Sequence, residues 1–269
     1  MQSASFSDLT LHYRWTSTGA SKPVIVFINS LGTDLRIWDE VQTRLGGAVS
    51  VLVYDKRGHG LSDLGPASFS MADHVSDLEK LLKHLQIGKA IICGLSVGGQ
   101  IAIGFTAKHP SRVAGLLLCD TAPKIGTVES WNSRIADVQR TGIASIADAV
   151  LERWFMPAFR KADNPAFAIA RNMLLRQSPE GYAATCSAIR DTDFSAEAAS
   201  LNLPALCIVG RDDGATPPEL VEDMARRIPN SSFQVIENCG HIPCLERPDE
   251  MAQLILEFMS KHLEGKSHD

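Results

Sequence analysis

The chain has 269 residues, of which 45% are hydrophobic and 21% are charged. These proportions are ordinary for a soluble globular protein and exclude a disordered chain, a collagen and a coiled coil. The 26 lysines and arginines and the 31 aspartates and glutamates give a net charge of −5, so the sequence offers no basic surface for nucleic acid or for an anionic membrane.

The N-terminal segment and the cysteines bear on where the protein works. Residues 1–15 lack the basic stretch and the apolar run of a signal peptide. No apolar run approaches the roughly 20 residues that span a bilayer. The six cysteines are too sparse for a disulfide scaffold and lack the C-x-x-C spacing of zinc sites. We therefore expect a cytoplasmic protein with free thiols.

Short runs rich in β-forming residues predict strands. They cover residues 9–15, 24–29, 49–54, 90–93, 113–119, 205–209 and 233–236. From residue 24 onward these runs are almost continuously apolar rather than alternating. That pattern is typical of strands buried on both faces of a parallel sheet.

Amphipathic stretches between these runs predict helices. Residues 71–85 carry apolar side chains at a period near 3.6, and residues 102–109 end at Pro110, which cannot continue a helix. A third helix begins at Pro248 and continues with two acidic residues, which suit the positive end of the helix dipole. Strands alternating with helices predict a mostly parallel, doubly wound α/β sheet with right-handed crossovers.

One region interrupts this alternation. From residue 123 to about residue 200 the sequence has no convincing strand, and a segment of that length is too long for a structureless loop in a compact domain. We therefore expect residues 1–122 and 201–269 to form the α/β core. Residues 123–200 are expected to form a helical cap, inserted over the carboxyl edge of the sheet.

The most specific local motif is the sequence GLSVG at residues 94–98, which lies between a predicted strand and a predicted helix. A sharp strand-to-helix turn strains the central residue and lifts its hydroxyl clear of the sheet, and small flanking residues let neighbouring elements approach. The motif therefore predicts Ser96 as a nucleophile. A glycine-rich turn without a catalytic serine is the alternative.

A nucleophilic serine needs a general base, and six of the eight histidines lie on predicted element surfaces or in the C-terminal tail. The other two are His59 and His241, which both lie at the carboxyl edge of the predicted sheet, where ligands of α/β proteins bind. His241 follows the last strand in a glycine-containing loop. Position alone leaves both histidines open.

The base needs an acid to orient it. Asp212 and Asp213 follow the predicted strand at residues 205–209, and Asp120 is a rival after the strand at residues 113–119. With Asp213 the chain order is Ser96, Asp213, His241, which is the serine–acid–histidine order of α/β-hydrolases. The attacked carbonyl oxygen also needs hydrogen-bond donors. We expect these to be the backbone N–H groups of Val97 and Leu31.

Five segments together resemble the α/β-hydrolase superfamily across essentially the whole chain. They are NSLGT at 29–33, YDKRGHGLS at 54–62, GLSVG at 94–98, GRDDGATP at 210–217 and GHIP at 240–243. In that family the acid is the fourth residue of a G-x-x-D-x-x-T-P stretch, which implies Asp213 rather than Asp212. The family's common His-Gly oxyanion motif is Asn29-Ser30 here, a departure similar to that of the 3-oxoadipate enol-lactonases of bacterial aromatic catabolism.

Segments of the predicted cap extend the resemblance to the enol-lactonases. These are WNSRI at 131–135, LERWF at 151–155 and PEGYAATCSAIR at 179–190. The resemblance implies that Ser96 attacks the lactone carbonyl with His241 as base, and that the acyl-enzyme is hydrolysed to 3-oxoadipate in the β-ketoadipate pathway. It implies no metal and no organic cofactor. Oligomeric state is left open.

The acidic lactone carries one carboxylate, which needs a cationic partner when it is buried. Trp131 and Arg134 lie three residues apart and share one face of a helix, so we expect Trp131 to wall the ring and Arg134 to pair with the carboxylate. Trp154 is a further substrate-binding candidate. The alternative is that Arg134 is a solvated helix residue and Trp131 belongs to the core of the cap.

Two other functions remain open at this stage. A broad carboxylesterase, or another cap-bearing serine hydrolase, would share every triad residue and differ only in the cap pocket. A hydrolase-fold receptor would bind its ligand without turnover. Epoxide hydrolases and haloalkane dehalogenases of this fold use an aspartate nucleophile, so Ser96 argues against both.

Overall fold

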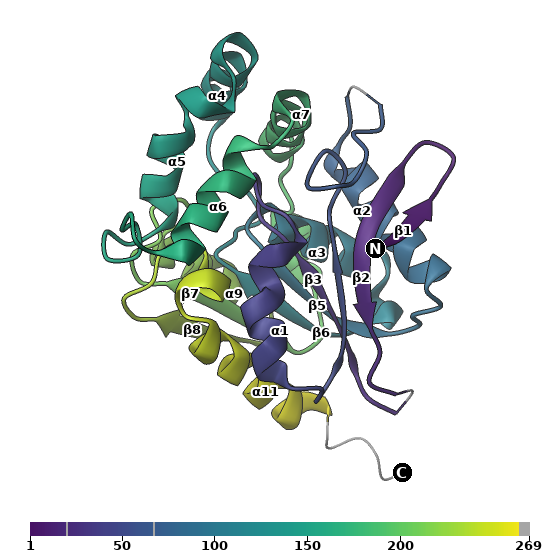
Figure 1. Ribbon diagram of the computed structural model, residues 1–269. Helices are drawn as coiled ribbons and strands as arrows, with labels where there is room; N and C mark the ends of the chain where they lie inside the picture. The colour runs from purple at the N-terminus through teal and green to yellow at the C-terminus, as the bar shows by residue number, and fades with distance from the viewer. Residues whose placement is uncertain (20, 67, 264–269) are drawn as a thin grey trace.

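A computed structural model of the protein describes residues 1–19, 21–66 and 68–263. Its centre is one eight-stranded sheet in the order β1-β2-β4-β3-β5-β6-β7-β8 (Figure 1). The strands are β1 (Gln2–Ser5), β2 (Thr10–Thr16), β3 (Val24–Ile28), β4 (Ser50–Tyr54), β5 (Ala90–Leu95), β6 (Val113–Cys119), β7 (Ala205–Gly210) and β8 (Ser231–Ile236).

The sheet is mostly parallel, as predicted. Strands β1 and β2 are antiparallel at one edge, and the six strands from β4 to β8 run parallel to one another. The central strands β4, β5 and β7 are buried at every position, which explains their continuous apolar runs. The edge strand β8 is only half-buried and alternates. The sequence analysis missed β1, which is short and largely polar.

Helices cover both faces of the sheet. Helix α1 (Asp39–Leu45) packs on α11 (Pro248–Leu263) on the face nearer the viewer in Figure 1. On the other face α3 (Val97–Lys108) contacts both α2 (Met71–His84) and α8 (Ser195–Ser200), and α8 contacts α9 (Pro218–Arg227). Short helical turns complete this part of the fold: η1 (Leu35–Trp38), η2 (Pro110–Arg112) and α10 (Pro243–Glu246).

Local sequence accounts for where these helices begin and end. Ser70 and Asp73 form a reciprocal capping box at the start of α2, and α11 begins at Pro248 as predicted. Helix α3 ends just before Pro110. It begins at Val97, earlier than the predicted start, because the elbow leads straight into the first helical turn. In the described part of the chain no helix is long and apolar enough to cross a membrane.

The segment between β6 and β7 is helical and, over its described residues, contains no strand. It comprises α4 (Val128–Thr141), η3 (Ile143–Ser145), α5 (Ala147–Trp154), α6 (Pro165–Leu175), α7 (Pro179–Arg190) and α8. Figure 1 shows α4 to α7 grouped beyond one end of the strands. We keep the word cap for residues 123–200, the range expected from the sequence. The division into core and cap stays a prediction, because α8 at the end of this range packs on α3.

Candidate active site

Ser96 occupies the turn between β5 and α3 in a strained backbone conformation. Its φ is 57° and its ψ is −119°, a left-handed region that is costly for a residue with a Cβ. Neighbouring strands hold the turn in place. Ser96 N–H donates to Cys119 O at 2.9 Å, and the Thr121 hydroxyl donates to Ser96 O at 2.6 Å. The serine side chain is thereby fixed at the end of the strand.

The two glycines of the motif are required by close contacts between backbones. A Cβ on Gly94 would lie 2.2 Å from Gly98 O, and a Cβ on Gly98 would lie 2.3 Å from Ile28 O. Neither position has room for a side chain, because the strand, the turn and β3 pass too close together. The G-x-S-x-G pattern therefore follows from the packing around the turn as well as from its chemistry.

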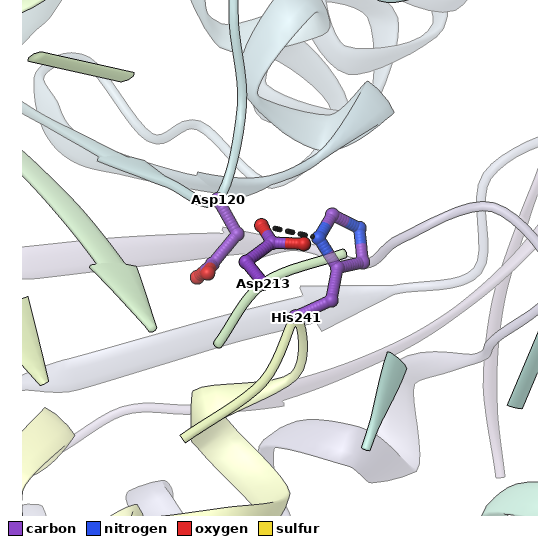
Figure 2. A group of neighbouring side chains, drawn as sticks. All are labelled: Asp120, Asp213 and His241. Atoms are coloured by element: carbon purple, nitrogen blue, oxygen red, sulfur yellow. Dashed lines mark hydrogen bonds and ion pairs between the residues drawn. The ribbon is translucent and has the colours of Figure 1, made fainter. Parts of the chain in front are cut away.

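His241 and Asp213 come from the loops after β8 and β7 and meet as a buried pair. Asp213 Oδ2 accepts a hydrogen bond from His241 Nδ1 at 2.8 Å, and both side chains are at most 2% exposed (Figure 2). Asp213 is also held by Thr216 Oγ1 at 2.6 Å and by the N–H groups of Ala215 and Thr216. The pair is oriented before any substrate binds.

The hydrogen bonds of Asp213 keep it ionised. Burial opposes ionisation, but the neighbouring His241 and the donors from Thr216 and Ala215 outweigh it and hold the pKa of Asp213 below its ordinary value. An ionised Asp213 favours a proton on His241 Nδ1, which leaves Nε2 free to accept a proton. Although Ser96 and His241 both lie in the described part of the chain, no hydrogen bond joins them; they line the same cavity.

The structure distinguishes the three candidate acids. Asp212 is exposed, whereas Asp213 holds His241. Asp120 lies beside Asp213 but its carboxyl points away from the imidazole (Figure 2). One of its oxygens accepts Gly210 N–H at 2.9 Å, and Oδ2 is buried with no hydrogen-bond partner among the described residues. Burial and the nearby Asp213 raise the pKa of Asp120 well above its ordinary value, which favours the neutral acid.

Asp120, Asp213 and His241 also have the residue types of a metal site, with ligand atoms within 4.8 Å of one another. Asp213 and His241, however, already use the facing atoms Oδ2 and Nδ1 in their mutual hydrogen bond. The raised pKa of Asp120 favours its neutral acid form, which is a poor metal ligand. The donor set therefore fits an acid–base pair with a supporting acid better than a cation site.

The rival base His59 has another task. Its Nε2 accepts Gly32 N–H at 3.1 Å, and its Nδ1 donates to Arg57 O at 3.2 Å. Burial, reinforced by Lys56, lowers the pKa of His59 well below its ordinary value and keeps the ring neutral. Both ring nitrogens are thus occupied by the backbone, and His59 supports the loop after β3.

The two expected oxyanion donors lie at the ends of β3 and β5. Val97 N–H is at the first position of α3, where a helix has no internal acceptor for it, and Leu31 lines the cavity. Among the described residues neither N–H has an acceptor. Val97 itself is fully buried and does not line the cavity. Both groups remain available to an oxygen bound beside Ser96.

A cavity of about 120 Å³ lies between the strand ends and the cap. One wall is formed by residues of the core, including Ser30, Leu31, Ser96 and His241. The other is formed by α4, the loop before it, α5 and α7, and it includes all three predicted substrate-binding residues. The cap residues that line the cavity are Ile125, Gly126, Ser130, Trp131, Arg134, Val150, Arg153, Trp154 and Ile189.

The predicted substrate-binding residues differ in how they are held. Trp131 is buried, and its indole N–H donates to Ile125 O at 2.7 Å. The guanidinium of Arg134 stacks over the Trp131 ring at 5.1 Å. Trp154 is buried and also ties the cap to the core, because its carbonyl accepts His241 N–H at 2.8 Å. Trp131 and Arg134 therefore act as one unit of the cavity wall.

The sequence analysis missed a second cation of the cavity. Arg153 lines it beside Arg134, and its Nε donates to Gly214 O at 3.2 Å. Partial burial and the charge of Arg134 lower the pKa of Arg153. Within the described chain no carboxylate pairs with either arginine. The available signal was its position next to Trp154 in the LERWF segment.

Glu246, also missed from the sequence, joins the cap to the loop of His241. Its two carboxylate oxygens accept Gly240 N–H at 2.6 Å and Met156 N–H at 2.9 Å. Burial raises the pKa of Glu246 to about 7. The loop that carries His241 is therefore held by the cap at two points, Glu246 and the Trp154 carbonyl.

Comparisons with known proteins agree with this architecture. The model of the alpha/beta hydrolase family matches residues 25–254. The 3-oxoadipate enol-lactonase 2 of Acinetobacter baylyi is 30% identical over 254 residues, which are 94% of each chain. The enol-lactonase structure from Burkholderia xenovorans superposes with a TM-score of 0.92 at 33% identity, covering 96% of this chain and 100% of that one.

Esterases are similar to the chain as well. The structure of a thermophilic esterase from Thermogutta terrifontis, with malate bound, has a TM-score of 0.90 at 32% identity and covers 97% of this chain and 100% of that one. The fold is thus shared by enzymes that act on different esters. Because the family match spans most of the sequence, the chain belongs to the alpha/beta hydrolase family.

Proposed function

We propose that the protein is a serine hydrolase that opens the ring of a small enol-lactone bearing a carboxylate, of the 3-oxoadipate enol-lactone type, in bacterial catabolism of aromatic compounds. The observation that carries this proposal is the cavity shared by Ser96, His241, Trp131 and Arg134. It combines a nucleophile and a base with an aromatic wall and a cation that no carboxylate of the described residues pairs with. The enol-lactonases among the relatives support the same substrate class.

In the proposed reaction His241 removes the proton of Ser96 Oγ as this oxygen bonds to the lactone carbonyl carbon. Asp213 keeps the imidazole oriented and stabilises its positive charge. The carbonyl oxygen becomes an anion facing the N–H groups of Leu31 and Val97. Ring opening breaks the bond to the enol oxygen, which leaves as an enolate and takes a proton from His241.

The acyl-enzyme is then hydrolysed by water. His241 takes a proton from the water as its oxygen bonds to the acyl carbon, and returns a proton to Ser96 as the ester bond breaks. The enol tautomerises to the ketone, which gives a dicarboxylate product. Every step uses groups on the cavity wall or next to it, and no step uses a metal or an organic cofactor.

The chemistry of the cavity supports a compact acidic substrate. Its volume of about 120 Å³ is well below the roughly 300–1,000 Å³ of sites for drug-sized ligands, which favours a single small ring over a long acyl chain. Arg134 and Arg153 supply two positive charges to the cavity without carboxylate partners among the described residues. The similar esterase holding malate, a dicarboxylate, is consistent with such a site.

A broad carboxylesterase is the second candidate, favoured by the similarity to esterases. The test is the loss of the ultraviolet absorbance of the enol-lactone on adding enzyme, with Ser96→Ala as the control. We expect turnover of the acidic lactone with a higher kcat/KM than that of a neutral nitrophenyl ester. Turnover of the ester alone would assign the protein to the carboxylesterases.

Covalent labelling of Ser96 with a fluorophosphonate separates both enzymes from a hydrolase-fold receptor, which binds its ligand without turnover. We also infer a cytoplasmic location, because all six cysteines are free thiols, as is usual in a reducing compartment. Attachment of a thiol-reactive maleimide to the denatured, unreduced protein taken from cells would check that the thiols are free there.

A further inference from the structure

Lys56 lies buried next to the oxyanion loop, residues 29–33. It follows Asp55 directly after β4 and is 1% exposed. Its Nζ donates a hydrogen bond to the backbone oxygen of Ser30 at 2.6 Å. The side chain neither lines the cavity nor contacts Asp213 or His241. It therefore reaches the active site only through the loop after β3.

The Ser30 carbonyl oxygen is held from a second direction. Thr33 Oγ1 donates to it at 2.9 Å, and Thr33 N–H donates at 3.4 Å. In a planar trans peptide the C=O and the following N–H point in opposite directions. Donors that hold the oxygen of Ser30 thus also set the direction of the N–H of Leu31, which belongs to the same peptide.

The neighbouring peptide of the loop is held separately. Gly32 N–H donates to His59 Nε2, so this N–H is already used. Leu31 N–H lacks an acceptor among the described residues, and Leu31 lines the cavity together with Ser96 and His241. Of the two N–H groups after Ser30, the one whose peptide oxygen is bound by Lys56 is the one left for a ligand.

We propose that Lys56 is a positioning residue that aims the Leu31 N–H at the oxyanion by holding the carbonyl oxygen of the same peptide. The inference rests on the proposed serine hydrolase mechanism. A donor that is already oriented stabilises the charge that develops in the transition state without reorganisation during the reaction. The same donor adds less in the ground state, where the oxygen carries little charge.

Burying the amine of Lys56 carries a desolvation cost. It lowers the pKa of Lys56 well below its ordinary value, against the opposing influence of Asp55 and Asp34. Methionine has a similar length and no polar group to desolvate, and no carboxylate of the described residues forms an ion pair with Lys56, so the change leaves no buried pair half broken. We therefore expect Lys56→Met to fold, so that its kinetics report on the loop.

The test compares Lys56→Met with the wild type on a neutral nitrophenyl ester, so that it stands even if the enol-lactone is not the substrate. We expect kcat to fall about 10- to 100-fold, less than the roughly 100- to 1,000-fold expected for deleting a donor, with little change in KM. Affinity for phenylboronic acid, which forms an oxyanion-like adduct on Ser96, should fall in parallel. Lys108→Met, at an exposed position on α3, is the matched control.

Thr33→Val provides a second route to the same peptide, because it removes the hydroxyl donor to Ser30 O and leaves Lys56 in place. We expect a smaller fall in kcat, about 3- to 10-fold, again with KM unchanged. It decides the question if Lys56→Met fails to fold. Unchanged kcat would overturn the proposal. So would a rise in KM for the ester equal to the fall in boronate affinity, since the lysine would then support only the shape of the pocket.

Discussion

The two walls of the cavity are built in different ways. The core wall consists of strand ends and the short turns after them, and its groups are fixed by backbone geometry: the strained Ser96, the hydrogen-bonded pair of Asp213 and His241, and the loop of Leu31. The cap wall consists of side chains projecting from helices, among them Trp131 and Arg134. The core wall is suited to the chemistry of ester cleavage, and the cap wall is suited to determining substrate specificity.

The comparison also shows where the two walls depend on each other. His241 is on the core wall, but its N–H is bound by the carbonyl of Trp154 and its loop by Glu246, which also holds Met156. Gly32 of the oxyanion loop is in contact with the cap as well, since a Cβ there would lie 3.2 Å from the Trp154 ring. Changes in the cap are therefore expected to affect the catalytic groups slightly, and changes in the core to affect them strongly.

The largest effect is expected at the nucleophile. Ser96→Ala removes the group that attacks the substrate, and we expect kcat/KM to fall on the order of 10³-fold or more while the protein stays folded, because the triad acts as a unit. Ester hydrolysis and fluorophosphonate labelling measure the loss, and circular dichroism checks the fold. Activity near that of the wild type would rule out the serine mechanism.

The next largest effect is expected at the acid. Asp213→Asn keeps the shape of the side chain but removes the charge that holds His241 in the right tautomer, so kcat should fall on the order of 10³- to 10⁴-fold. Asp212→Asn, at an exposed position, should stay within about twofold of the wild type. A larger loss at Asp212 than at Asp213 would reverse the assignment.

Asp120→Asn is the buried control for the same measurement. The raised pKa of Asp120 favours its neutral acid form, so we expect the amide to remove no charge and the pH at which activity falls on the acid side not to move. The amide oxygen still accepts Gly210 N–H. A shift of the acid side toward lower pH by about one unit would mean that Asp120 is ionised and acts on His241 electrostatically.

A smaller and substrate-dependent effect is expected in the cap. Arg134→Ala should raise KM for the acidic lactone about 10- to 100-fold, the usual range for losing a hydrogen bond to a charged group, and leave KM for a neutral ester nearly unchanged. Arg140→Ala, on the outer face of the same helix, is the matched control. Equal responses of both substrates would show that Arg134 supports the cap rather than binds the carboxylate.

The smallest effect is expected on stability, at Glu246. Its folded pKa of about 7 exceeds the ordinary 4.5, so the folded protein binds this proton more tightly than the unfolded chain. Its contribution to the free energy of unfolding therefore falls as the pH rises from about 4.5 to 7. Urea unfolding measures this. The free energy of unfolding of the wild type minus that of Glu246→Gln should be smaller at about pH 8 than at about pH 5.

Glu237→Gln gives the contrasting case. Arg211 lowers the pKa of Glu237 below its ordinary value, so this carboxylate stays ionised from about pH 5 to about pH 8. The difference in free energy of unfolding between the wild type and Glu237→Gln should therefore not fall with pH. If the difference in free energy of unfolding between the wild type and Glu246→Gln is constant or grows with pH, it contradicts the raised pKa of Glu246. It would then leave the hydrogen bonds to Gly240 and Met156 as the whole contribution of Glu246.

Most of the fold could be predicted from local patterns. Continuous apolar runs identified the parallel strands, since residues buried on both faces of a sheet have no polar side to alternate with. Strand β1 was missed because it is four residues long with mostly exposed side chains. Ser96, the candidate acids and the two candidate histidines were predicted because each follows a strand at the same edge of the sheet, where the topology of an α/β fold brings strand ends together. The resemblance to the α/β-hydrolases then selected Asp213 over Asp212.

The sequence by itself determined most of the elements, the parallel sheet and a small set of candidate residues at the strand ends, because periodicity and turn chemistry are local properties of a chain. Only the tertiary structure decided which acid bonds to His241, that His59 holds a backbone N–H, and that Arg153, Glu246 and Lys56 reach the active-site loops. These contacts join segments far apart in the chain. Their partners depend on how the cap packs on the core, which no pattern of spacing along the sequence records.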